Sequence, residues 1–180
     1  MEKALRIYDI NFAGLSVGEH VYSYAIGDDF FELFQESPIT KGNGKVQLLF
    51  DKQTGHFELS FRLEGHVEIE CDRCTANINY PIFNNFKLYI KFHGEDEVTE
   101  DTDEVIYIPR TDASINVAQY IYEYIILSVP MVKNCDYLEE QYKNCNQEVL
   151  KLLNREPEAE NKPIADDDRW SALKNIKFDN

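Results

Sequence analysis

The sequence predicts an α+β domain, with a mostly antiparallel β-sheet or partly closed barrel in the N-terminal half followed by packed helices. Three observations support this class. Most of residues 5–92 fall into short runs rich in β-branched and aromatic side chains, bounded by Gly, Asn, Asp or Pro. Residues 115–129 are apolar around most of a helical circumference. The length of 180 residues corresponds to about one domain.

The expected strands follow one another with short turns between them. Residues 57–63 alternate strictly between apolar and polar side chains, which predicts a strand with one buried and one solvated face. Gly55 and Gly65 stand at the ends of this run and are expected to be turn residues. The full set of expected strands is residues 5–10, 21–26, 45–51, 56–63, 66–71, 82–92 and 104–109.

Two helices are expected after the strands. The first covers residues 115–129, carries a polar stripe of Asn116, Gln119 and Glu123, and ends before Pro130. We expect Glu123 to face solvent on this stripe. The second lies within residues 137–154, where apolar side chains recur every three or four positions. The pattern does not distinguish one long helix from a loop followed by a helix that starts near Cys145.

The chain is therefore divided into a single α+β domain at 1–153, a linker at 154–165 and a C-terminal docking segment at 166–180. The linker contains Pro157 and Pro163 and few apolar residues. In the last segment Asp168 is placed to cap a short helix that carries Trp170 and Leu173 on one side. An aromatic anchor after a linker indicates docking, either onto this domain or onto a partner, through Asp168, Arg169, Trp170 and Leu173.

The charge balance bears on the class of partner. Lys and Arg number 18 against 33 Asp and Glu, so the net charge is −15, which opposes sequence-independent binding of nucleic acid. Residues 94–104 hold seven acids and no base, a pattern typical of a solvated loop and also compatible with a strip that docks a basic partner. The N-terminus lacks the pattern of a signal peptide and residues 115–132 are too polar to span a membrane, so a cytoplasmic protein is expected.

The four cysteines carry the strongest chemical signal. Cys71 and Cys74 form a Cys-x-x-Cys turn between expected strands, and Cys135 and Cys145 follow about sixty residues later. Four thiolates would hold one structural Zn²⁺ with no open position for substrate or water. Two other interpretations remain open: a redox-active Cys71–Cys74 pair, and buried structural cysteines. His66 is an alternative ligand, although the four histidines are scattered along the chain.

Motifs for an enzyme are missing from the sequence. It contains no Gly-rich phosphate loop and no Gly-x-Ser-x-Gly elbow. We therefore expect a protein that is not an enzyme, has no small-molecule substrate and is not bound to a membrane.

The order of motifs resembles the YceD family of large ribosomal RNA subunit accumulation proteins. The resemblance covers about residues 55–177. It depends most on the Cys-Asp-Arg-Cys turn, on Ile-Ile-Leu-Ser-Val-Pro at 125–130 and on Asp-Arg-Trp-Ser-Ala-Leu-Lys at 168–174. It implies a cytoplasmic role in biogenesis of the large ribosomal subunit and accumulation of its RNA. Further Cys or His residues follow the Pro in this family, and they map here to Cys135 and Cys145.

We therefore expect a non-enzymatic factor that contacts a basic ribosomal protein or a large-subunit precursor, with ribosomal RNA contacted only indirectly. An acidic chain suits a basic protein better than it suits bare RNA. One alternative is a thiol-redox protein that uses Cys71 and Cys74. The other is a direct binder of ribosomal RNA that uses a basic patch within the strands. The patch residues would be Arg62, Arg73, Lys87 and Lys91.

Overall fold

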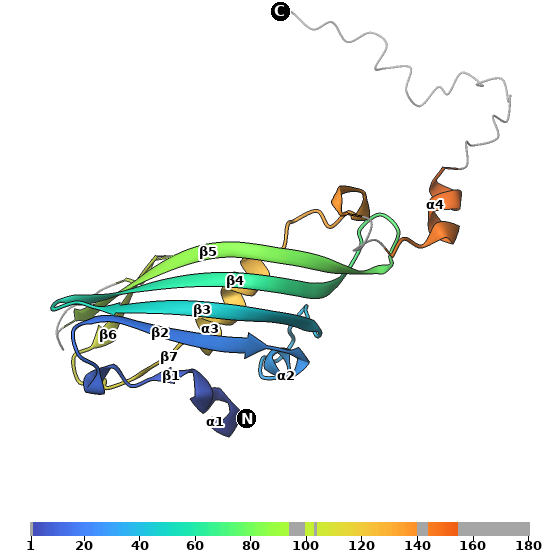
Figure 1. The fold of residues 1–180 in the computed structure, drawn as a ribbon. Helices are drawn as coiled ribbons and strands as arrows, with labels where there is room; N and C mark the ends of the chain where they lie inside the picture. The colour runs from blue at the N-terminus through green and yellow to red at the C-terminus, as the bar shows by residue number, and fades with distance from the viewer. Residues whose placement is uncertain (1, 94–99, 103, 140–143, 155–180) are drawn as a thin grey trace, which may run out of the picture.

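The computed structural model describes residues 2–93, 100–102, 104–139 and 144–154. Its main feature is a five-stranded sheet with the strand order β2-β3-β4-β5-β6 (Figure 1). All neighbours are antiparallel except β5 and β6, which are parallel, so the prediction of a mostly antiparallel sheet is confirmed. Within the described residues the sheet is open, with β2 and β6 at its edges. The strands are β2 (Gly18–Ile26), β3 (Gly42–Lys52), β4 (His56–Glu70), β5 (Asn77–His93) and β6 (Val105–Pro109).

Shorter elements surround this sheet. A second, two-stranded sheet joins β1 to β7. The short strands and helices are α1 (Glu2–Leu5), β1 (Asp9–Ile10), α2 (Asp28–Phe31), β7 (Ile115–Asn116), α3 (Ala118–Leu127) and α4 (Gln147–Leu153). Helical turns of the 3-10 type are η1 (Arg6–Tyr8), η2 (Phe12–Gly14) and η3 (Cys135–Tyr137). In the part of the chain described, no helix is long and apolar enough to cross a membrane.

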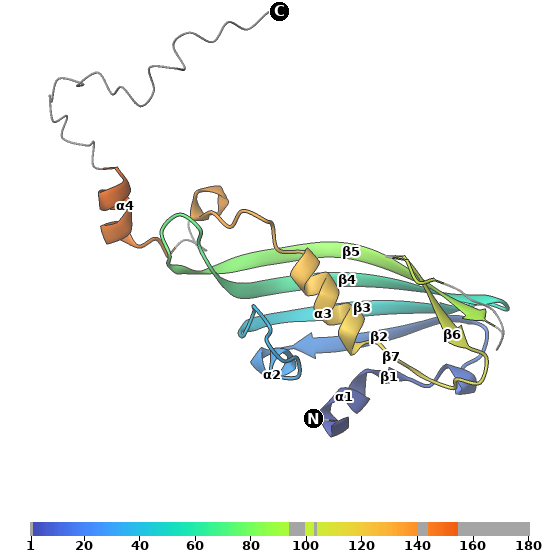
Figure 2. The ribbon, with the colours of Figure 1, turned by 180° about the vertical axis from the view of Figure 1, so that it is seen from behind.

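The core lies between the sheet and α3, which crosses one face of the sheet (Figure 2). Alternate side chains of β4, such as Phe57, Leu59 and Phe61, are almost fully buried on this face. Tyr124 of α3 packs its ring against Phe61 and stacks on Phe86, with centroids 5.1 and 4.4 Å apart. Burial of each large apolar side chain contributes about 1.5–3 kcal/mol, so this interface accounts for much of the stability. No helix of the described residues crosses the opposite face of the sheet (Figure 1).

The expected packed helices are not confirmed. Helix α3 packs on the sheet, whereas α4 buries none of its residues and extends from the end of the sheet (Figure 1). Helix α4 begins after Asn146, whose side chain accepts hydrogen bonds from the N–H groups of Glu148 and Val149. The second helix is therefore a short one that follows a loop, which decides between the two alternatives that the sequence left open.

Helix α3 begins later than predicted. Residues 115–116 pair with β1 as strand β7, and the Asn116 side-chain oxygen then accepts the N–H of Ala118 at 3.0 Å, where the helix starts. The prediction for the polar stripe is confirmed within the helix. Glu123 is exposed and accepts a hydrogen bond of 2.8 Å from Gln119.

The predicted strand over residues 5–10 is wrong for its first four positions. Residues 2–8 form α1 and η1, and only Asp9 and Ile10 pair as strand β1. A strand would place Leu5 and Ile7 on one face and Tyr8 on the other. In the structure Leu5 is partly buried, Ile7 is 69% exposed and Tyr8 is buried, because the chain has a helical period there.

Gly65 is not a turn residue, contrary to the prediction. Strand β4 runs unbroken through it, and Gly65 pairs with Gly44 of β3. A Cβ atom at Gly65 would lie 2.4 Å from the carbonyl oxygen of Asn43 and 2.5 Å from the Cα of Gly44. Glycine is needed here because two backbones approach closely, which is the other common role of a strand glycine. Gly55 does lie in the turn between β3 and β4, as predicted.

The remaining predicted strands are confirmed in position. The runs at 21–26, 45–51 and 82–92 fall in β2, β3 and β5, although β5 begins five residues earlier than predicted. The run at 104–109 corresponds to β6 without residue 104, and the two runs at 56–63 and 66–71 merge into β4, which ends at Glu70. The predicted linker at 154–165 and docking segment at 166–180 lie outside the described residues apart from Asn154, and so do Asp168, Arg169, Trp170 and Leu173. Most of the acidic run at 94–104 also lies outside them.

Candidate metal centre

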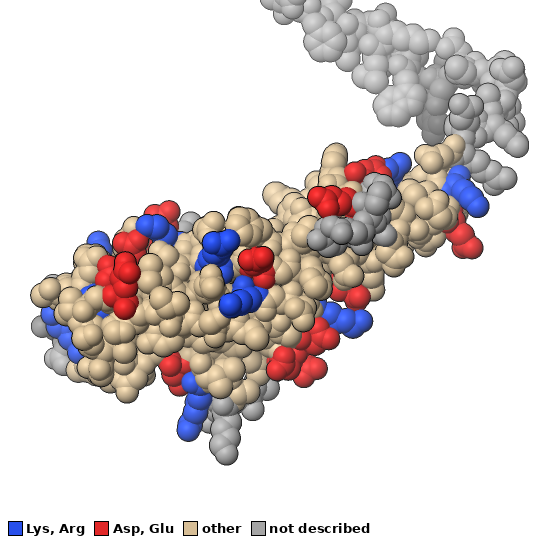
Figure 3. All heavy atoms as spheres, in the orientation of Figure 1, with Lys and Arg blue, Asp and Glu red and all other residues tan. Residues whose placement is uncertain are grey.

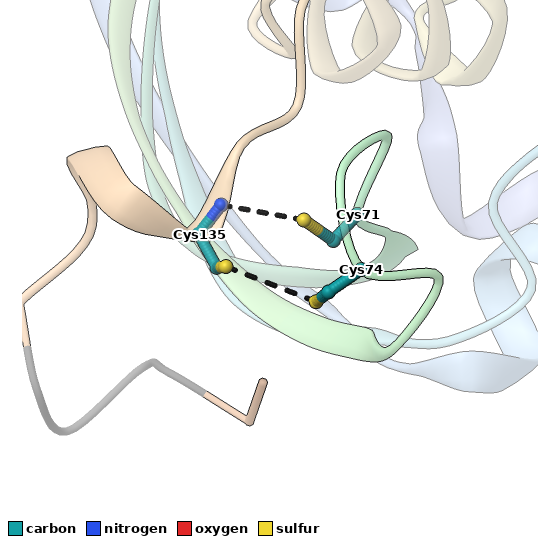
Figure 4. A group of neighbouring side chains, drawn as sticks. All are labelled: Cys71, Cys74 and Cys135. Carbon is teal, nitrogen blue, oxygen red and sulfur yellow. Dashed lines mark hydrogen bonds between the residues drawn. The ribbon is translucent and has the colours of Figure 1, made fainter. Parts of the chain in front are cut away.

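The Cys-x-x-Cys sequence forms the loop of the hairpin between β4 and β5. The Cys71 N–H donates to the carbonyl of Ala76, and the Thr75 N–H donates to the carbonyl of Cys71, both at 2.9 Å. Thr75 closes the turn in the left-handed region, with a φ of 56°. This tight loop directs the side chains of Cys71 and Cys74 toward Cys135 (Figure 4).

Cys135 belongs to a distant part of the chain that packs against this loop. It lies in η3, and its backbone N–H donates to the Sγ of Cys71 at 3.4 Å. The Sγ atoms of Cys74 and Cys135 are 3.8 Å apart, and the three sulfurs lie within 4.8 Å of one another. All three cysteines are fully buried. The structure thus brings together three of the four predicted ligands as a compact, shielded group.

Cys145 joins this group through Cys135. Its Sγ lies 3.0 Å from the Sγ of Cys135, and the residue is half-buried just before α4. The neighbouring Asn144 donates from its side chain to the carbonyl of Asn77, at the start of β5. All four predicted cysteines therefore meet at one end of the sheet, with Cys145 at the rim.

The arrangement of sulfurs fits a tetrahedral metal ion. Zinc–sulfur bonds of about 2.3 Å place the sulfurs of a regular tetrahedron about 3.8 Å apart. The separation of Cys74 and Cys135 equals that value, the three buried sulfurs lie within 4.8 Å of one another, and the Cys135–Cys145 separation of 3.0 Å is shorter. Thiolate ligands favour Zn²⁺ or another soft ion. Among the described residues, the group close enough to hold an ion is Cys71, Cys74 and Cys135, with Cys145 in contact with Cys135 alone.

The electrostatics of the group favour a thiolate at one position. Burial raises the pKa of Cys71, but the backbone N–H groups of Cys74, Cys135 and Arg73 point at its sulfur and lower the pKa to about 7. The pKa of Cys135 is raised, first by burial and then by its hydrogen bonds with Cys145, Cys71 and Cys74. In the absence of a cation, one thiolate at Cys71 therefore opposes ionisation of Cys135.

Two ion pairs fasten the cysteine loop to the segment that carries Cys135. Asp72 exchanges backbone and side-chain hydrogen bonds with the main chain of Lys133 at 2.7–2.8 Å, and the Lys133 ammonium lies 3.4 Å from its carboxylate. The backbone N–H of Lys133 is the main cause of a lowered pKa at Asp72. Arg73 forms an ion pair with Asp136. Sequence reasoning missed both contacts, although opposite charges flank the two cysteine segments.

The structure also locates the alternative ligand His66 and the four residues of the predicted basic patch. His66 is exposed on β4 and does not belong to the sulfur group found among the described residues. Arg62, Lys87 and Lys91 share the open face of the sheet, whereas Arg73 is separate, at the cysteine loop.

Arg62, Lys87 and Lys91 do not form a continuous positive patch on the open face. Lys87 pairs with Glu58 at 2.6 Å, and Arg62 lies over the ring of Phe83. Acidic and basic side chains are interspersed on this face (Figure 3).

Comparison with known families identifies the relatives of this chain. The model of the family described as large ribosomal RNA subunit accumulation protein YceD matches residues 59–177. The chain belongs to the YceD family. The match includes all four cysteines and the residues predicted to form the docking segment, so the resemblance seen in the sequence is confirmed. Searches of curated proteins and of solved structures gave no match.

Proposed function

We propose that this YceD-family chain is a non-enzymatic factor for large ribosomal subunit biogenesis and ribosomal RNA accumulation. It acts in the cytoplasm, mainly through contacts to a basic ribosomal protein or to an assembly particle. The observation that carries the proposal is the family match over residues 59–177, since the family is described by accumulation of the large-subunit RNA. Contact to ribosomal RNA is indirect in this proposal.

A structural zinc ion completes the fold in this proposal. Cys71, Cys74, Cys135 and Cys145 would hold it, and it would tie the β4–β5 hairpin to the chain after α3. Support comes from the sulfur separations and from the full burial of three of the thiols. A four-sulfur site leaves no coordination position for substrate, so the ion would contribute folding free energy rather than catalysis.

Protein contact is favoured over RNA contact by charge. The net charge of −15 repels a polyphosphate chain and attracts a basic protein. On the open face of the sheet basic side chains lie among acidic ones, and Lys87 is paired with Glu58. The segment with Asp168, Arg169, Trp170 and Leu173 is the second part of the chain that we assign to partner binding.

A thiol-redox function is the alternative that one observation favours, because the pKa of Cys71 is lowered to about 7. Its sulfur and that of Cys74 are nevertheless fully buried, so a dithiol substrate would need the loop to open. Redox exchange depends on access as well as on the thiolate fraction. Mild oxidation followed by mass spectrometry tests this function, which predicts a reversible Cys71–Cys74 disulfide.

The function is tested by affinity capture of the tagged full chain from extract of its own cells, at low and moderate salt. We expect large-subunit proteins or precursor particles at low salt, with recovery falling as salt screens the charges. A basic protein that stays bound after nuclease treatment supports contact through protein. Loss of every ribosomal component on nuclease treatment supports the RNA alternative, and capture of no ribosomal component contradicts the proposal.

The docking segment needs its own comparison. Trp170→Ala should reduce capture, whereas Phe83→Ala removes a comparably large aromatic side chain that is exposed on the open face. Equal capture by the wild type and both variants would show that Trp170 is not part of the contact.

A further inference from the structure

Strand β2 leaves one edge of the sheet unpaired. It pairs with β3 over all nine residues without a bulge, and in the part of the chain that the structure describes no strand pairs with its other side. Exposed edges are usually protected by Lys, Pro or a bulge, because free N–H and C=O groups recruit other strands. Residues 18–26 contain no Lys, Arg or Pro. This edge therefore lacks the usual protection against an added strand.

A hollow of about 390 Å³ with both polar and apolar lining atoms lies beside this edge. Ile7 lines this hollow and is 69% exposed, although its side chain is apolar. The rings of Tyr8 and Tyr24 pack 5.1 Å apart and form a rigid floor. The lining residues are Ile7, Tyr8, Tyr22, Ser23, Tyr24 and Ala25. An added strand could place one apolar side chain in this hollow, which is how edge-binding peptides gain specificity.

The surroundings of this edge are acidic. From Ile7 to Thr40 the sequence has six acids and neither Lys nor Arg. Asp29 lies close enough to the hollow to contribute, after burial, to the raised pKa of Tyr8. Bases near this stretch are Arg6, just before it, and Lys45 and Lys52 of β3, which pair with Ala25 and Gly18. The Lys52 ammonium is bound to the carbonyls of Phe12 and Leu15, at the start of β2. The unpaired edge thus belongs to a stretch of chain in which acids outnumber bases.

We propose that the free edge of β2 binds an extended, Lys- or Arg-rich segment of a partner protein as a sixth strand. Main-chain hydrogen bonds to β2 would provide affinity, the hollow beside Tyr8 would take an apolar side chain, and Asp29 with its acidic neighbours would select basic residues. A second copy of this chain is a poorer occupant, because each copy carries a net charge of −15 and presents the same acidic edge. The inference rests on the proposed contact to a basic protein and names its surface.

The probe is a fluorescent ten-residue peptide in which Lys alternates with Val or Thr. It is compared with a peptide of equal charge in which Pro replaces the Val and Thr residues, because Pro cannot pair as a strand. We expect the full chain to bind the first peptide about tenfold more tightly than the second at low salt, with chemical-shift changes in the amides of β2. Equal binding of both peptides would overturn the strand model.

The site is tested with the double variant Ile7→Lys and Asp29→Lys. Its matched control is Leu152→Lys with Glu148→Lys, which makes the same change in net charge at exposed positions of α4, away from β2. We expect the first variant to weaken peptide binding about tenfold and the control to weaken it less than about twofold. An equal loss in both variants, or sedimentation showing a dimer that Ile7→Lys dissociates, would overturn the proposal.

These results separate the inference from the proposed function. A chain that binds the peptide at β2 but captures no ribosomal component supports the edge site and contradicts the ribosomal role. Capture of ribosomal proteins that the double variant leaves unchanged supports the role and contradicts the edge site.

Discussion

Removal of Cys135 should disconnect the two chain segments that the sulfur cluster joins. Cys74 and Cys135 are separated by 61 positions, and closing a loop of that length in the unfolded chain corresponds to about 4 kcal/mol. A zinc ion bound at both ends would constrain the chain in the same way. For a chain of this size 1 kcal/mol changes Tm by about 2–4 °C, so loss of the ion should lower Tm by about 10 °C.

The assay combines zinc analysis with thermal unfolding, in the presence and absence of EDTA. Wild-type protein purified without chelators should contain one zinc per chain, and EDTA should lower its Tm by about 10 °C. Cys135→Ser should contain no zinc, melt near the EDTA-treated wild type and show no further effect of EDTA. His66→Ala is the matched control, since His66 is exposed on β4, and it should keep both the zinc and the wild-type response.

Two results would refute this reasoning. If the wild type carries no metal and its Tm is the same with and without EDTA, the cysteines are buried structural residues and the sulfur geometry has another origin. Zinc retained by Cys135→Ser at the wild-type level would instead show that the ion is bound elsewhere.

Three further perturbations test the fold around the site. Gly65→Ala should lower the free energy of unfolding by about 3 kcal/mol in a urea titration because its Cβ would meet backbone, whereas Gly55→Ala, with open space around it, should change little. Burial is the main cause that raises the pKa of Tyr124 from 10.0 to about 12, so the unfolded chain loses this proton first as the pH rises. The free energy of unfolding should therefore fall between pH 10 and 12. In Tyr124→Phe this decrease should be smaller, and an unchanged decrease would contradict its assignment to Tyr124. The Arg73–Asp136 pair is partly exposed, so a double-mutant cycle should give a coupling of less than about 1 kcal/mol, and a much larger value would show that the pair is shielded from water.

The alternation of side chains along the chain was enough to predict most of the large sheet. In β4, Phe57, Leu59, Phe61 and Leu63 are all buried, as the two-residue period requires. Local patterns failed where distant groups decide the conformation. Residues 5–8 alternate like a strand, yet Tyr8 is buried against Tyr24 and Phe30, and its carbonyl accepts the N–H of Val117.

Residue types and their spacing were enough to predict which side chains could bind a soft metal and that two of them share one tight turn. They could not show that Cys135, 61 positions from Cys74, meets that turn, because the contact depends on how the chain after α3 returns to the end of β4. Only the tertiary structure revealed that Asp72 and Arg73 fasten the two segments together, and that β2 lies at the edge of the sheet. Strand order and loop docking depend on contacts between residues far apart in the chain, whereas residue type and alternation are local properties.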